Sequence, residues 1–157
     1  MRSEMTLSFF EHAEDDIVWW RSPDTIRSSH ARMLVVDDDR DAAEAWQFLA
    51  QAMGFECLAV TNARQVCETV RRWQPFAVVL DVAMPGIDGC ELARRLRGGA
   101  DTRSAILIAW SGFTSDAAMA NAREAGFDAH CAKPLAPSRV LAALRRAVDR
   151  DAGLHAR

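Results

Sequence analysis

The chain has 157 residues, of which 50% are hydrophobic and 26% charged, with a formal net charge of −3. This length and composition are typical of one globular domain, and the acidic balance supplies no basic field for unspecific binding to nucleic acid. No apolar run approaches the length of a membrane span, and the N-terminal residues turn acidic too early for a secretory signal. We therefore expect a cytoplasmic protein.

The cysteines are few and separated in sequence. None of them forms a CxxC pair, and each lies in an apolar context: Cys57, Cys67, Cys90 and Cys131. Their spacing fits neither a zinc site nor a disulfide framework. We expect reduced and mostly buried thiols.

Residues 1–31 stand apart as an N-terminal extension. Their pattern predicts a short helix over residues 6–20 and then a polar linker broken by Pro23. The expected helix carries six large apolar side chains: Phe9, Phe10, Ile17, Val18, Trp19 and Trp20. The favoured interpretation is a helix packed on its own domain, and the alternative is an arm that docks a partner or a second copy of the chain as a homodimer.

From residue 32 onward, apolar runs alternate with segments of helical periodicity. Strands are predicted at residues 32–37, 56–60, 76–81, 105–111 and 128–134, and helices at residues 40–55, 62–73, 88–98, 114–127 and 137–153. The first, third and fourth strands are apolar on both faces, as in the centre of a parallel sheet covered by helices. We expect one α/β domain over residues 32–150 and a C-terminal tail over residues 151–157.

Polar side chains gather where these strands end. In a parallel α/β sheet, ligands bind outside the carboxyl ends of the strands, so these ends belong together. The residues found there are Asp37, Asp38, Asp39, Asp81, Ser111, Gly112 and Lys133. Carboxylates brought this close repel one another and need a cation. Oxygen ligands favour Mg²⁺.

A carboxylate beside Mg²⁺, a hydroxyl and an ammonium suits a phosphoryl group. Mg²⁺ and Lys133 would offset the charge on the phosphoryl oxygens, and Ser111 would donate a hydrogen bond. The Asp81 carboxylate can itself be the nucleophile and form an aspartyl-phosphate. Lys133 is the one lysine among 19 basic residues, and a compact ammonium suits a phosphoryl oxygen better than the planar arginine fork does.

The segments "LVVDDD", "VVLDVAMPGIDG", "IAWSG" and "CAKP", in this order, resemble the receiver domain of two-component response regulators. The resemblance covers residues 32 to about 150. It implies a flavodoxin-like, doubly wound sheet of five parallel strands in the order 2-1-3-4-5 with five helices. It also implies Asp81 as the phosphoacceptor, Ser111 and Lys133 as its catalytic partners, and the backbone of Gly112 as a phosphoryl ligand.

The resemblance further implies how Mg²⁺ is held. Asp38, Asp81 and the main-chain carbonyl of Ala83 would be direct ligands, and Asp37 would act through water. The peptide bond between Lys133 and Pro134 is usually cis in this family. Asp39, the third acid of the run, is expected to start the following helix.

His130 and Trp110 lie near the predicted site, and their roles are considered separately. Three residues before the lysine, receivers commonly carry Tyr or Phe as a switch residue, whereas this chain has His130. A switch built on His130 is expected to be weak, altered or pH-sensitive, and the alternative is a histidine exposed on a strand edge. Trp110 precedes Ser111 on a strand, so it should face the core.

The resulting hypothesis is a single-domain response regulator. It would accept a phosphoryl group on Asp81 from a sensor histidine kinase or a histidine phosphotransfer protein. Its chemistry would be limited to self-catalysed, Mg²⁺-dependent phosphorylation and autodephosphorylation, so it is not otherwise an enzyme. Output would pass by protein contact through the fourth helix, fifth strand and fifth helix, about residues 114–148, with no nucleic-acid or membrane partner.

Two alternatives belong to other classes. A haloacid-dehalogenase-like phosphatase also uses an aspartate nucleophile at a strand end, but it usually needs a second acid two residues later, where this chain has Ala83. A receiver-like adaptor would bind partners without phosphorylation. The complete set of acids, hydroxyl and lysine argues against this adaptor.

Overall fold

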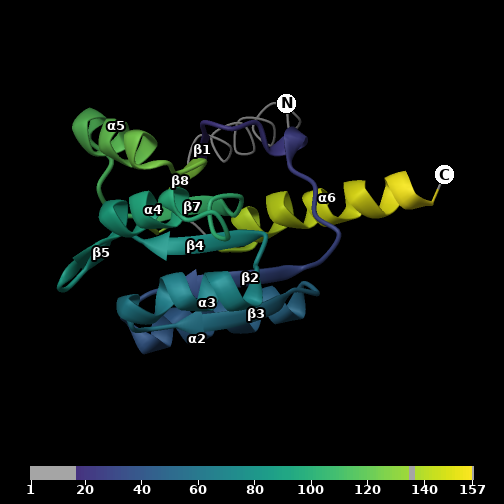
Figure 1. The fold of residues 1–157 in the computed structure, drawn as a ribbon, viewed down its shortest axis with the longest axis horizontal. Helices are drawn as coiled ribbons and strands as arrows, with labels where there is room; N and C mark the ends of the chain where they lie inside the picture. Colours follow the sequence, from purple (N-terminus) through teal and green to yellow (C-terminus); the bar gives the residue numbers. More distant parts are fainter. Residues whose placement is uncertain (1–16, 135–136, 157) are drawn as a thin grey trace, which may run out of the picture.

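The sheet is the centre of the computed structural model, which describes residues 17–134 and 137–156 (Figure 1). Its strand order is β1-β8-β7-β4-β2-β3, and all neighbours except β1 and β8 run parallel. The five parallel strands are β2 (Arg32–Val36), β3 (Glu56–Val60), β4 (Ala77–Asp81), β7 (Ile106–Ser111) and β8 (Ala129–Ala132). Numbered along the chain, they follow the order 2-1-3-4-5, which confirms the predicted fold.

Helices cover both faces of this sheet. The α-helices of the described residues are α2 (Arg40–Ala52), α3 (Val66–Trp73), α4 (Gly89–Gly98), α5 (Asp116–Ala125) and α6 (Pro137–His155). Side chains of α2 and α6 share one core with Met33 and Val35, whereas α3, α4 and α5 share the other with Leu34 and Val36. Because β2 is buried on both faces, its sequence is a continuous apolar run and does not alternate.

Short elements fill the connections of the described residues. The 3-10 helices are η1 (Pro23–Thr25) and η2 (Ala63–Gln65), and a small hairpin after β4 consists of β5 (Ala83–Met84) and β6 (Ile87–Asp88). Gly86 turns this hairpin at a φ of 81°, which favours glycine. A Cβ on Gly89 would lie 2.6 Å from the Val82 Cα and 2.8 Å from the Asp81 carbonyl oxygen. Glycine at this position therefore lets α4 begin directly against the end of β4.

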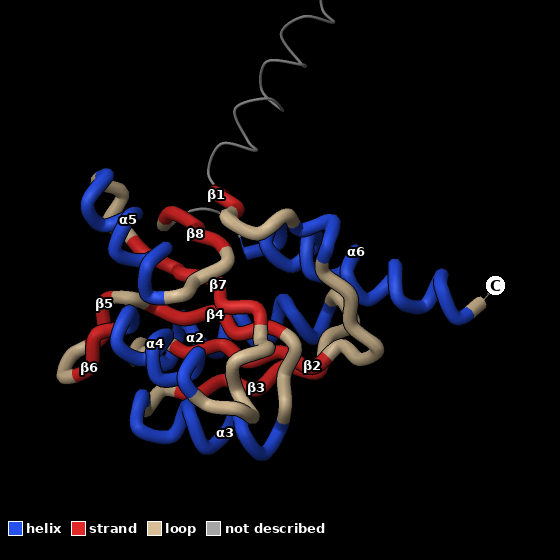
Figure 2. Tube along the Cα trace, turned by 45° about the horizontal axis from the view of Figure 1, so that its top comes forward, coloured by secondary structure: helices blue, strands red, loops and turns tan. Residues whose placement is uncertain are grey.

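The N-terminal extension differs from its prediction. Residues 17–19 form strand β1 (Ile17–Trp19), which pairs antiparallel with β8, so a helix is wrong for these residues. Residues 6–16, the rest of the expected helix, lie outside the described residues. Without β1, β8 would be an edge strand with unpaired backbone groups. Figure 2 shows β1 beside β8, where its pairing satisfies these groups. The side chains of Ile17 and Trp19 pack against the α2–α6 core.

The segment after β1 is anchored to α6. Ile26 is 2% exposed and lies in the core shared by α2 and α6. The Arg150 guanidinium donates to the Pro23 carbonyl at 2.7 Å and to the Asp24 carboxylate at 2.6 Å. Residues 17–31 are thus integral to the folded body. At the other end, α6 continues to His155, so the expected tail is helical over residues 151–155, and this helix projects beyond the sheet (Figure 1).

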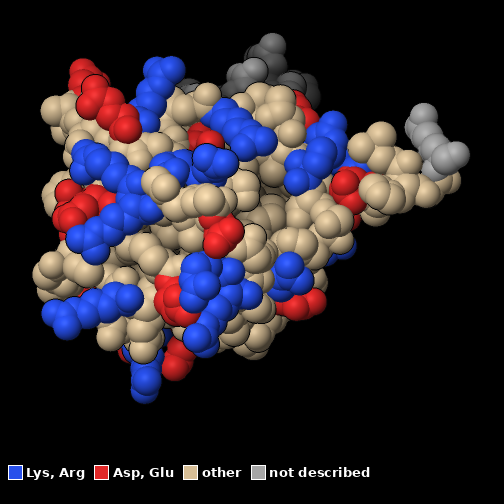
Figure 3. All heavy atoms as spheres, in the orientation of Figure 1, with Lys and Arg blue, Asp and Glu red and all other residues tan. Residues whose placement is uncertain are grey.

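The other structural predictions concern core residues and the surface. Three of the four cysteines are buried, as expected: Cys57, Cys90 and Cys131. Trp110 is a core residue, since its ring meets the Trp46 ring edge-on at a centroid distance of 5.1 Å. Among the described residues, no helix has the length and hydrophobicity needed to cross a membrane. Basic and acidic side chains are interspersed over the face in Figure 3, without a field of one sign.

Because the extension is anchored in the core, truncating one of its buried side chains should strongly destabilise the protein. Ile26→Ala should lower the free energy of unfolding by about 2–5 kcal/mol, because it opens a cavity in a buried core. The matched control is Val18→Ala in β1, where the side chain is 39% exposed and the loss should be small. Urea denaturation of both variants measures the difference. Equal losses would show that residues 20–31 contribute no core packing.

Candidate functional site

Three carboxylates meet at the carboxyl ends of β2 and β4. Val36 pairs with Leu80 in the sheet, which places Asp37 beside Asp81. Carboxylate oxygens of Asp37, Asp38 and Asp81 all lie within 4.8 Å of one another. Asp37 and Asp81 are each 3% exposed, whereas Asp38 faces solvent. The predicted acidic cluster therefore exists, with two buried members and one open to a ligand.

Main-chain donors orient the acids of this cluster. The Asp39 N–H donates to Asp37 Oδ1 at 2.9 Å, and the Ala83 N–H donates to Asp81 Oδ1 at 3.0 Å. Asp39 itself caps α2 by accepting from the Asp41 and Ala42 N–H groups, as expected for a helix start. The three adjacent acids of the "DDD" run thus have three different surroundings.

Lys133 reaches the cluster from β8. Its Nζ lies 3.4 Å from Asp81 Oδ1, and its side chain keeps partial exposure. Its main-chain N–H donates to the Ser111 carbonyl at 2.9 Å, which ties the end of β8 to the end of β7. The peptide bond between Lys133 and Pro134 is cis, as the resemblance implied. One ammonium is thereby placed against the buried carboxylate at the tip of the central strand.

Ser111 and Gly112 end β7 at the same edge of the sheet. The Ser111 side chain is buried, and its Oγ accepts a hydrogen bond from the Phe113 N–H at 3.0 Å. Open space surrounds the place where a Cβ of Gly112 would lie, so its backbone is accessible to a ligand. Ser111 also lines a cavity that reaches His130. Sequence reasoning missed both this cavity and Phe113, because helix packing creates the cavity and no motif marks the residue.

His130 is not exposed on a strand edge. It is 3% exposed, pairs with Val18 of β1, and has the Trp20 ring at a centroid distance of 6.5 Å. Burial lowers the pKa of His130, and a hydrogen bond with the Phe113 backbone acts in the opposite direction. Its Nε2 finds no partner among the described residues. The alternative of an exposed histidine is wrong because β1 covers this part of β8.

The electrostatics of the cluster favour a bound cation. Burial is the main cause that raises the Asp37 pKa from 3.8 to about 6, and the neighbouring Asp81 carboxylate adds to the rise. The Asp39 N–H and Lys133 lower the pKa but do not cancel this effect. A set of oxygen ligands that carries excess negative charge suits a hard divalent ion such as Mg²⁺.

The raised Asp37 pKa predicts a pH-dependent stability. Because the folded state binds this proton more tightly than the unfolded state, stability should fall as the pH rises from 3.8 to about 6. Asp37→Asn removes the charge and retains an acceptor for the Asp39 N–H. In chelator at neutral pH it should be more stable than wild type by roughly 1–2 kcal/mol, after allowance for solvent screening.

Thermal melts across this pH range in chelator measure the difference. It should vanish in acid, where Asp37 is neutral in both states, and saturating Mg²⁺ should stabilise wild type more than the variant. A difference in melting temperature between wild type and Asp37→Asn that does not change with pH would contradict the electrostatic explanation.

Comparisons with known sequences agree with this geometry. A family model described as "Response regulator receiver domain" matches residues 33–145. DNA-binding response regulator MtrA of Mycobacterium bovis is 31% identical over 128 residues, which are 82% of this chain and 54% of that protein. Response regulator MprA of Mycolicibacterium vanbaalenii is 32% identical over 119 residues, 76% of this chain and 51% of that protein. The chain thus spans about half the length of these relatives.

Solved structures share the fold. A CheY-like receiver domain protein from Methanospirillum hungatei has a TM-score of 0.70 at 22% identity and covers 80% of this chain and 98% of its own. A response regulator from Desulfuromonas acetoxidans has a TM-score of 0.64 at 26% identity and covers 73% and 94%. With the strand order and the matched family model, these findings show that the chain belongs to the response regulator receiver domain family of two-component systems.

Proposed function

We propose that this chain accepts a phosphoryl group on Asp81 in two-component signalling. The proposal rests on the charged groups that surround this buried carboxylate at the tip of the central strand β4. Asp37 and Asp38 lie close enough to share a cation with it. The Lys133 ammonium lies 3.4 Å from its Oδ1 and is available to a phosphoryl oxygen.

Asp38, Asp81 and the Ala83 carbonyl are the proposed direct ligands of Mg²⁺, with Asp37 acting through water. The exposure of Asp38 leaves its carboxylate open to an incoming ion, which supports its direct role. When bound, the ion supplies positive charge that offsets the charge on the phosphoryl oxygens and orients the donor. The hydrogen bond from the Ala83 N–H to Asp81 keeps the main chain of Ala83 beside the cluster.

The proposed donor is a phosphohistidine on a sensor histidine kinase or on a histidine phosphotransfer protein. A carboxylate oxygen of Asp81 attacks the phosphorus, the P–N bond breaks, and its electron pair stays on the imidazole nitrogen. Lys133, the Ser111 hydroxyl and the Gly112 N–H stabilise the charge on the transferred group. Later attack by water would release inorganic phosphate. We propose no catalysis on other substrates.

Residues 32–150 form the proposed receiver unit, and output is proposed to pass by contact with other proteins. The proposed surface includes α5, β8 and α6, but β1 pairs with β8 there, so a partner meets β1 as well. Possible partners include a second copy of the chain. The relative MtrA is named as DNA-binding, but the match covers 54% of that protein. The interspersed charges in Figure 3 and the net charge of −3 favour protein partners for these 157 residues.

The other two candidate functions are weaker. Family membership and Ala83 remove the support for a haloacid-dehalogenase-like phosphatase. A phosphorylation-independent adaptor makes a different prediction from ours, because its acidic cluster would not react with a phosphodonor. Phosphorylation of Asp81 therefore separates it from the proposed function.

Asp81→Asn should abolish phosphorylation, because an amide is a poor nucleophile. Incubation with Mg²⁺ and acetyl phosphate should add one phosphoryl group to the wild type, measured by intact-mass spectrometry. The control is Asp116→Asn, an exposed acid at the start of α5, which should react as the wild type does. Equal labelling of wild type and Asp81→Asn would overturn the site assignment, and an unreactive wild type would favour the adaptor.

The two other acids should differ in their effect on Mg²⁺. Asp38→Ala removes a direct ligand and should weaken binding by more than the roughly 10–100-fold typical of an outer partner. Asp37→Ala should have the smaller effect. Isothermal titration of wild type and both variants with MgCl₂ measures the affinities. Identical losses in the two variants would contradict the division of roles.

A further inference from the structure

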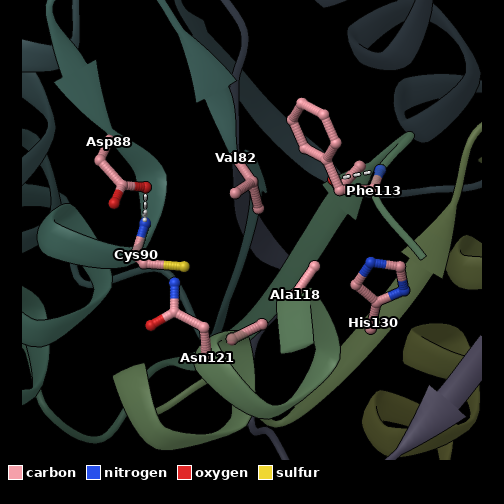
Figure 4. Close-up of a pocket in the computed structure, with 9 residues that line it drawn as sticks. Val82, Asp88, Cys90, Phe113, Ala118, Asn121 and His130 are labelled. Carbon is pink, nitrogen blue, oxygen red and sulfur yellow. Dashed lines mark hydrogen bonds between the residues drawn. The ribbon is translucent and has the colours of Figure 1, made fainter. Parts of the chain in front are cut away.

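A cavity lined in part by Ser111 opens beside the end of β7 (Figure 4). It has a volume of about 210 Å³ and extends between β7, β8, α4 and α5. Its wall is formed mainly by apolar or weakly polar groups, including Val82, Cys90, Ala118 and Ala122, with the His130 ring at one end. An apolar cavity of about 150 Å³ is large enough to take benzene. This cavity is therefore large enough to hold one phenyl ring.

Phe113 stands at the mouth of this cavity. Its side chain is 60% exposed, although it also contributes to the cavity lining. In Figure 4 its ring points away from Ala118 and Asn121, which leaves the interior open. An exposed phenyl ring next to an apolar cavity of sufficient size gains from burial if the loop that carries it can move.

Two hydrogen bonds involve the Phe113 backbone of that loop, and one of them is made with His130. The Phe113 N–H donates to Ser111 Oγ at 3.0 Å. Ser111 is also the hydroxyl proposed to donate to a phosphoryl group on Asp81. When the hydroxyl turns toward that group, Oγ leaves the Phe113 amide, so phosphorylation removes one of the two hydrogen bonds that hold the loop. The ring then gains burial only in the phosphorylated state, which is the differential interaction that a switch requires.

Position 130 is poorly suited to fill the same space. His130 is already buried and lies on β8, whose two edges are paired with β1 and β7. An imidazole fixed in the cavity wall leaves the volume open. The loop after β7 has no such pairing and connects directly to the Ser115 cap of α5.

We propose that Phe113 is the mobile aromatic residue of this receiver and that its ring enters the cavity when Asp81 is phosphorylated. This inference rests on the proposed function. Entry of the ring displaces residues 112–115 and thereby changes the start of α5. Phe113 thus connects the phosphoryl group on Asp81 with the proposed contact surface. His130 remains in the wall of the cavity and does not move.

Cys90 provides the readout, because its side chain lines the cavity and is otherwise buried. The protein is phosphorylated with acetyl phosphate and Mg²⁺, pulsed with iodoacetamide, and the alkylation of each cysteine is quantified by peptide mass spectrometry. A ring in the cavity should slow Cys90 alkylation about tenfold, the population change expected from burying an apolar side chain. Half-buried Cys67 lies outside this cavity and is the internal reference.

The variants separate this inference from a general tightening of the fold. Phe113→Ala should be phosphorylated but should show no protection of Cys90. The matched control is Phe48→Ala, which removes a ring that is 72% exposed on α2 and should retain the protection. Protection that persists in Phe113→Ala, or phosphorylated wild type without protection, overturns the inference but not the function. Absence of phosphorylation from the wild type, seen by intact mass, overturns the proposed function itself.

Discussion

The proximity of two buried carboxylates, Asp37 and Asp81, is the constraint on which the rest of the structure depends. Each is 3% exposed, and their oxygens lie within 4.8 Å of one another and of Asp38. Burial is the main cause that raises the pKa of Asp37, and repulsion by the Asp81 carboxylate adds to the rise. The arrangement persists because neighbouring parallel strands fix both residues. A bound cation would relieve this repulsion, together with the Lys133 ammonium that lies 3.4 Å from Asp81 Oδ1.

The two helical layers hold the strands that carry Asp37 and Asp81 in place. The strands that carry the acids are buried on both faces, so neither can shift without opening a core. Gly89 lets α4 approach the end of β4 closely, and the Asp39 cap begins α2 immediately after the cluster. The helices thus hold the backbone groups around Asp37 and Asp81 in place, and the proposed response is assigned to the loop after β7.

The N-terminal extension changes the surface that is proposed to meet partners. Because β1 completes the edge of β8 and Ile26 enters a core, residues 17–31 are structural. They also bury His130, which removes this side chain from the surface. Any partner that approaches between α5 and α6 meets β1 before β8. The proposed contact surface therefore differs from that of a receiver with a bare β8 edge.

The order of strands and helices, the acidic cluster, Lys133 and the burial of Trp110 could all be predicted from the sequence. Each depends on local periodicity, or on the rule that parallel strands bring their carboxyl ends to one edge. The sequence alone did not identify β1, since "IVWW" fits a helix or a strand and only the open edge of β8 decides between them. The burial of His130, the course of α6 to His155 and the cavity facing Phe113 were likewise decided by tertiary packing. These features depend on residues distant in sequence, whose contacts no local pattern encodes.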